Sequence, residues 1–142
     1  MHTTPPGYGA WPSPARGFTL IEMLVVMAVV GILFNLALSS YQSNVLKTKR
    51  QAAQSCLMEY AQYMERYYTT NTTNPQSFTG ASLSATAACA TSLASAYAFT
   101  LSSTSSTYTL TATARGTQVK DTGCTPLTLQ QDGTRSPPSC WP

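Results

Sequence analysis

The side chains that could do chemistry in this 142-residue chain are few, and their spacing does not support catalysis. The one histidine, His2, lies at the amino terminus, so the rest of the chain lacks the usual general base and the commonest nitrogen ligand for metals. Among the five acidic residues, Glu59 and Glu65 are six positions apart, which does not place them on one face of a helix. We therefore expect a protein that is not an enzyme and that binds no cofactor or metal.

The four cysteines are the second chemical feature. None has the C-x-x-C spacing that is typical of zinc or redox motifs. An even, dispersed set indicates two disulfides in an oxidising compartment, and the alternative is a set of reduced, buried thiols in a cytosolic protein. Spacing alone leaves three pairings open for Cys56, Cys89, Cys124 and Cys140.

The composition limits the classes of protein that fit. Charged residues make up 9% of the chain, against roughly 25% in an ordinary soluble protein, and the length suits one domain. The net charge of +3 and the scattered Lys and Arg residues do not indicate a nucleic-acid surface.

Residues 18–38 form an apolar run with a single charge, Glu22. As a helix, this run would span about 31 Å, the thickness of a bilayer core. The preceding residues, "MHTTPPGYGAWPSPAR", are rich in proline and contain only Arg16 as a strong base, and no A-x-A-like site follows the run. These features differ from a cleaved secretory signal, so we predict a transmembrane helix.

The rest of the chain predicts an α+β fold. The apolar residues Ala53, Leu57, Tyr60, Met64 and Tyr67 recur at helical spacing, which extends the helix through an amphipathic second half, residues 39–70, that packs against a core. In the head, residues 71–142, alternating segments predict strands at 96–101, 107–114 and 125–130 and, after a turn at 131–133, a short fourth strand. We expect one long N-terminal helix packed against a small antiparallel sheet of about four strands.

The run "RGFTLIEMLVVMAVVGIL" resembles the class III signal of type IV pilins and pseudopilins: a glycine, then a hydrophobic residue, then Thr-Leu-Ile-Glu at the start of the membrane helix. The resemblance implies that a prepilin peptidase removes residues 1–17 by cutting between Gly17 and Phe18. It also implies N-methylation of Phe18. Glu22 would then be the fifth residue of the mature chain.

The same resemblance assigns an assembly role to Thr19, Glu22 and Gly31. It implies that the Glu22 carboxylate pairs with the terminal amine of a neighbouring subunit, since two charges in a dry helix bundle stabilise one another. The "SSYQ" that begins at Ser39 is similar to the "PxYQ" that commonly follows the segment. Serine replaces the common proline there, so the sequence leaves open whether the helix is kinked.

The C-terminal stretch "CTPLTLQQDGTRSPPSCW" is similar to the disulfide-closed end loop of pilin heads, notably those of minor pilins. This similarity implies a bridge between Cys124 and Cys140, which leaves Cys56 to pair with Cys89. In the chain-entropy model, a disulfide that closes a loop of about 15 residues stabilises the folded protein by about 3 kcal/mol.

The resemblance implies a structural subunit of a type IV pilus (a fimbrium), of the type IVa class and more consistent with a minor than with a bulk pilin. Its partners would be other pilin subunits, the prepilin peptidase, the inner-membrane assembly platform and the lipid bilayer. It would span the inner membrane once, with its head in the periplasm, before it enters an extracellular filament that serves twitching motility, cell adhesion or DNA uptake. The positive-inside rule favours the opposite orientation, because Lys47, Lys49 and Arg50 outnumber Arg16, but the cysteines and the cleavage signal outweigh it. We interpret this basic cluster as a solvated helix face, with binding to anionic lipid headgroups as the less favoured alternative.

Three alternatives remain. A pseudopilin of type II secretion shares the leader, and a membrane-anchored periplasmic enzyme would use the head for chemistry. An adhesin or DNA-binding pilus tip would bind nucleic acid through Arg115, Lys120 and Arg135. Ordinary solvated charge explains these three cations as well, and the mild net charge favours that explanation.

Overall fold

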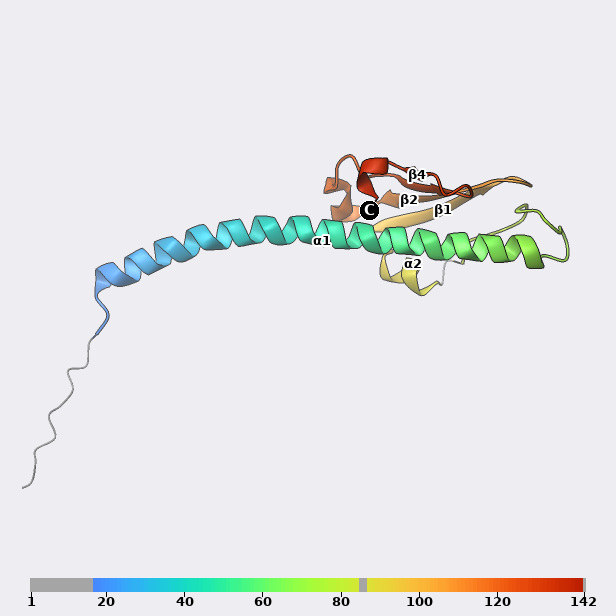
Figure 1. Cartoon of the computed structure of the whole chain (residues 1–142). Coiled ribbons are helices and arrows are strands. Elements are labelled where there is room, and N and C mark those ends of the chain that lie inside the picture. Colours follow the sequence, from blue (N-terminus) through green and yellow to red (C-terminus); the bar gives the residue numbers. More distant parts are fainter. Residues whose placement is uncertain (1–16, 85–86, 142) are drawn as a thin grey trace, which may run out of the picture. The chain divides into compact units, whose positions relative to one another are not determined.

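The computed structural model describes residues 17–84 and 87–141, so most of the predicted leader, residues 1–16, lies outside the described residues. The first element is the helix α1, Leu20–Thr70, which continues without a break through Gly31 and Ser39 (Figure 1). It ends where the Asn71 side-chain oxygen accepts hydrogen bonds from the backbone N–H groups of Thr73 and Asn74, an arrangement that favours a turn over further helix. The predicted long helix is confirmed.

The chain divides into two compact units, residues 1–38 and residues 39–142. The first unit contributes the start of α1, and its described residues are all exposed. The second unit adds the second half of α1 to the segment 71–142 and contains every other helix and strand that the structure describes. From here on, the head means this whole unit, residues 39–142.

The head is built on a four-stranded antiparallel sheet in the order β1-β2-β3-β4. The strands are β1, Tyr97–Ser103; β2, Tyr108–Ala114; β3, Leu127–Gln130; and β4, Arg135–Ser136. Strands β1 and β2 form a hairpin whose register pairs Tyr97 with Ala114 and Ser103 with Tyr108. In β2 the buried residues alternate with more exposed ones, as expected for a sheet with one face on a core, so the predicted sheet is confirmed.

The core lies between the sheet and the second half of α1. The predicted helical stripe supplies it, because Ala53, Leu57, Tyr60 and Met64 are buried, whereas Tyr67 is half-buried and donates a hydrogen bond from its hydroxyl to the Thr79 carbonyl. From the sheet come the buried side chains of Tyr97, Tyr108, Leu110, Ala112, Leu127 and Leu129. Burial of these apolar groups is the main force that holds α1 on the sheet.

Three short helices complete the head: α2, Ala88–Ser92; the 3-10 helix η1, Gly116–Lys120; and the 3-10 helix η2, Pro138–Cys140. The sequence did not predict them, since five residues or fewer carry no helical period. A disulfide joins Cys56 of α1 to Cys89 of α2, and a second joins Cys124 to Cys140 of η2. The bridges thus tie α2 to α1 and close the C-terminal loop.

Candidate functional site

The first candidate site is the start of α1, which forms a capping box. The backbone N–H of Thr19 donates a hydrogen bond to the Glu22 carboxylate (3.4 Å), and the Glu22 N–H donates one to the Thr19 hydroxyl (3.2 Å). Two N–H groups that the helix cannot satisfy by itself are thereby paired. Glu22 therefore has a partner within its own chain. The Thr-x-x-Glu spacing in the sequence carries this signal, but our sequence interpretation of Glu22 did not consider a capping box.

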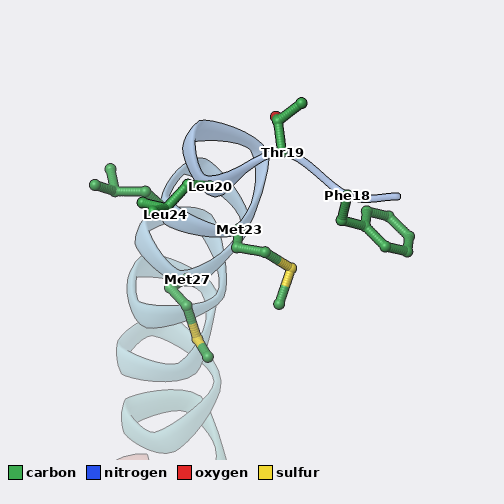
Figure 2. Close-up of a pocket in the computed structure, with 6 residues that line it drawn as sticks. All are labelled: Phe18, Thr19, Leu20, Met23, Leu24 and Met27. Atoms are coloured by element: carbon green, nitrogen blue, oxygen red, sulfur yellow. The ribbon is translucent and has the colours of Figure 1, made fainter. Parts of the chain in front are cut away.

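Within the described residues, no other part of the chain covers the apolar side chains at and beyond the capping box. Phe18 is 80% exposed and Leu20 is 85% exposed, and Figure 2 shows them with Met23, Leu24 and Met27 around a shallow apolar depression at the helix start. The helix is long and apolar enough to cross a membrane, and none of its apolar stretch is buried. An uncovered apolar surface of this extent requires lipid or another protein chain.

Gly31 lies within this exposed apolar stretch. A β-carbon built on it would meet no atom within 4 Å, so no contact in the described part of the chain requires a glycine there. A glycine in a helix interior costs about 1 kcal/mol relative to alanine. Its use is explained if another helix approaches closely at this point, as small residues allow in membrane helix pairs.

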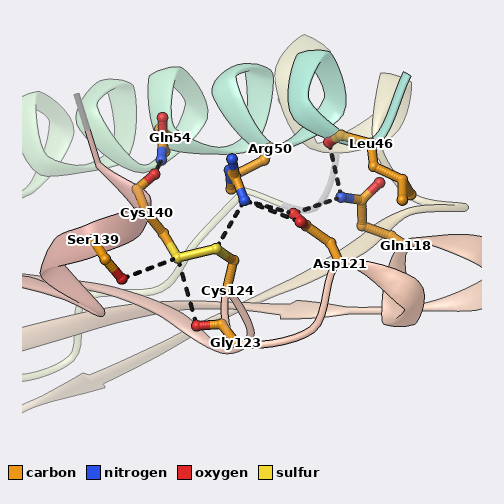
Figure 3. Close-up of polar contacts among 9 residues, drawn as sticks. All are labelled: Leu46, Arg50, Gln54, Gln118, Asp121, Gly123, Cys124, Ser139 and Cys140. Carbon is orange, nitrogen blue, oxygen red and sulfur yellow. Dashed lines mark hydrogen bonds and ion pairs between the residues drawn. A yellow bond between two sulfur atoms is a disulfide. The ribbon is translucent and has the colours of Figure 1, made fainter. Parts of the chain in front are cut away.

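The second candidate site is a cluster of polar side chains that fixes the C-terminal part of the head on α1 (Figure 3). Arg50 forms an ion pair with Asp121 at 3.0 Å, with side chains 18% and 14% exposed, and its Nη1 also lies 2.8 Å from the Cys124 sulfur. Two amides extend the cluster, because Gln118 donates to the Leu46 carbonyl at 3.0 Å and Gln54 to the Cys140 carbonyl at 2.6 Å.

This polar cluster corrects the sequence interpretation of Arg50. The sequence analysis did not predict the other residues of the cluster. Lys47, Lys49 and Arg50 were interpreted as one solvated helix face, but Arg50 is half-buried and paired. The available signal was position: Arg50 lies three residues before Ala53 and Gln54 lies three residues before Leu57, which places both beside the core stripe on α1. Their partners, in η1 and after β3, could not be found by spacing.

The three cations proposed as nucleic-acid contacts are exposed, and each borders a different depression of the head. Arg115 lines a depression with Tyr60 and Phe99. Lys120 lines another, of about 250 Å³, with Leu46 and neighbouring residues of α1. Arg135 lies on β4, where its guanidinium stacks 5.2 Å from the centre of the Trp141 ring.

One titratable pair lies at the edge of the core. The Tyr108 hydroxyl donates a hydrogen bond to the Glu65 carboxylate at 3.1 Å. Burial, followed by the negative charge and hydrogen bond of Glu65, raises the pKa of Tyr108 from 10.0 to about 12. The tyrosine thus remains a hydrogen-bond donor at any physiological pH. No group of His, Cys, Asp and Glu residues suited to a metal ion occurs in the described parts of the chain.

A long helix with an uncovered apolar start, continued into a disulfide-bonded sheet domain, is the architecture of a type IV pilin. A solved structure titled "High-Resolution Structure of a Type IV Pilin from Shewanella oneidensis" matches it with a TM-score of 0.54 and 25% identity, covering 68% of this chain and 98% of the other.

Two family profiles match the chain, and together they span both units. "Prokaryotic N-terminal methylation motif" covers residues 12–34, and "Type IV minor pilin ComP, DNA uptake sequence receptor" covers residues 39–128. The chain therefore belongs to the type IV minor pilin family that the second profile describes.

Two curated relatives agree with the pilin class. The fimbrial protein EcpC of Eikenella corrodens is 32% identical over 71 residues, and the type II secretion system core protein G of Pectobacterium carotovorum subsp. carotovorum is 32% identical over 73 residues. The matched parts cover 50% and 51% of this chain, and 46% and 47% of the relatives, so the chain spans about half the length of the curated relatives it matches. The match to the secretion protein is consistent with the pseudopilin alternative. The family profile that covers residues 39–128 of the head, however, is a pilin profile.

Proposed function

We propose that this chain is a minor subunit of a type IV pilus, with a structural and not a catalytic role. The observation that carries the proposal is the uncovered apolar start of α1, headed by Thr19 and Glu22 and joined to a head of the minor pilin family. A prepilin peptidase cuts between Gly17 and Phe18 and methylates the new terminus. Before assembly the chain spans the inner membrane once, with its head in the periplasm, and the assembly platform then moves it into the filament.

Glu22 links the membrane form to the filament form. In the single chain its carboxylate accepts a hydrogen bond from Thr19, which lowers the cost of placing a charge near the bilayer. In the filament the carboxylate pairs with the amine of Phe18 in a neighbouring subunit and sets the register of the two helices. Gly31 allows the helices to approach closely.

Mass spectrometry of filaments sheared from the cell surface tests this function. We expect a species that begins at N-methylated Phe18 and that gains the mass of four hydrogens on reduction, because two disulfides open. A protein that is absent from the filaments, or that retains Met1, would contradict the proposal.

A second function, binding of duplex DNA by the assembled subunit, is favoured by the name of the matched family and by a basic surface on the head. Lys120 ends η1, and the hydrogen bond from Gln118 to the Leu46 carbonyl holds η1 beside the exposed Lys47. Arg50 does not contribute, since Asp121 neutralises it. Lys47 and Lys120 are therefore the cations that we assign to the phosphate backbone.

Fluorescence anisotropy with labelled duplex DNA, at several salt concentrations and with the full chain in detergent, tests the second function. Replacement of Lys47 or Lys120 by alanine should weaken binding for every sequence and lower the salt slope by about 1 per residue. Arg66→Ala is the matched control, because Arg66 is an exposed cation near the other end of α1. An equal loss in the control would show that the effect is one of total charge and would contradict the assignment.

A further inference from the structure

A groove on the head lies between α1 and the turn from β3 to β4, and nothing in the pilin role accounts for it. It is a shallow, open groove with a volume of about 390 Å³. Apolar groups of Ala61 and Leu129 form part of its lining. Its polar side chains, which define what we call the amide groove, are Gln62, Glu65, Gln130, Gln131 and Arg135.

Two of the polar side chains are held in place by Tyr108. Its hydroxyl donates to one oxygen of Glu65 (3.1 Å), and its backbone N–H donates to the side-chain oxygen of Gln131 (3.1 Å). Among the described residues, no hydrogen-bond partner occupies the second Glu65 oxygen or the Gln131 amide nitrogen, so both can bind another molecule. A side chain already fixed by one hydrogen bond loses little entropy when it makes the next.

Arg135 is fixed in a different way. Its guanidinium stacks on the Trp141 ring, and the indole N–H of Trp141 donates to the Ser136 carbonyl at 3.3 Å, which orients the ring. Within the described residues, the ion pair of the head joins Arg50 to Asp121 and does not involve Arg135. The Arg135 N–H groups are thus positioned without a carboxylate partner.

The chemistry of the amide groove determines the class of ligand. Glu65 and Arg135 balance in charge, which disfavours both a polyanion and a metal cation as the ligand. Amides, a carboxylate and a guanidinium supply acceptors and donors side by side, and sugar hydroxyls are groups that both donate and accept. The apolar lining suits the C–H face of a sugar ring. We propose that the amide groove binds a neutral saccharide, a function beyond that of a filament subunit.

Tryptophan fluorescence provides a direct test, because one of the two tryptophans, Trp141, stacks on a groove residue. The full chain carrying Trp11→Phe is placed in a zwitterionic detergent, since sugar-headed detergents would compete. It is then titrated with maltose, cellobiose and lactose. We expect a saturable change with at least one of them, at a Kd on the order of 1 mM.

Variants locate the binding. Gln62→Ala should raise the Kd about fivefold, and Arg135→Ala by a similar factor, since each removes hydrogen bonds to the sugar. Gln62 is exposed, so its loss leaves the fold intact even if Arg135→Ala disturbs Trp141. The matched control is Gln51→Ala, an exposed glutamine of α1 outside the groove.

Three results would overturn the proposal. The first is no saturable change with any of the three sugars up to about 100 mM, and the second is an equal effect of Gln51→Ala and Gln62→Ala. The third is a Gln62-sensitive change produced by a short DNA duplex and by none of the sugars, which would assign the groove to nucleic acid.

Discussion

The two units of the chain place their apolar residues in opposite ways. In residues 18–38 the apolar side chains face outwards, as at Leu33, which is 59% exposed, whereas in the head Leu57 and Leu110 are completely buried. Leucine therefore has a different role in each unit. In the head it stabilises the fold of this chain, and in the first unit its burial depends on lipid or on other chains.

The largest expected effect comes from a matched pair of leucine substitutions. Leu57→Ala should lower the free energy of unfolding of the head by about 2–5 kcal/mol, because it leaves a cavity in the core. Leu33→Ala should leave it unchanged. Denaturant unfolding of the full chain in detergent, followed by near-UV circular dichroism, measures both. Equal losses would mean that the first unit is part of the folded core.

The ion pair of the head gives a smaller effect. Asp121→Ala should lower the free energy of unfolding of the head by about 1–3 kcal/mol, because it leaves the half-buried Arg50 without its carboxylate partner. The same denaturant experiment measures this change. The double variant Arg50→Met/Asp121→Ala should recover part of this loss. Glu59→Ala, at an exposed acid of α1, is the control. If Asp121→Ala were as stable as the control, the pair would not hold the C-terminal loop on α1.

The smallest effect is a pH dependence limited to alkaline solution. Tyr108 has a pKa of about 12 in the folded head and about 10 when unfolded, so the unfolded chain loses its proton first. The contribution of this group to stability is constant below pH 10 and decreases between about pH 10 and 12. Tyr108→Phe should therefore show a flatter decline than the parent over this range. If the stability of the variant and of the parent fell in parallel between about pH 10 and 12, the raised pKa of Tyr108 would be contradicted.

Much of this fold follows from periodicity. The spacing of Ala53, Leu57, Tyr60 and Met64 predicted the helix and its buried face, and alternation predicted the hairpin of β1 and β2. Both signals are local, and both are strong because one face of each element is buried. The motif around Gly17 and Glu22 predicted the family.

The remaining features depend on contacts between distant parts of the chain. Arg50 and Asp121 are 71 residues apart, and their pairing requires η1 to dock on α1, which no local pattern encodes. The amide groove likewise brings Gln62 of α1 beside Gln131 of the turn after β3. Long-range packing decides such polar sites, so they became visible only in the folded chain.

The central claim is that the charge of Glu22 serves assembly and not the fold of the head. Incorporation into sheared filaments, measured for Glu22→Gln, Glu22→Ala and the control Glu59→Gln, tests it most directly. Glutamine keeps the capping box but removes the charge. We predict that both Glu22 variants lose about tenfold or more in incorporation with unchanged head stability, and that the control is normal. Normal incorporation of Glu22→Gln would show that capping suffices, and it would contradict the account.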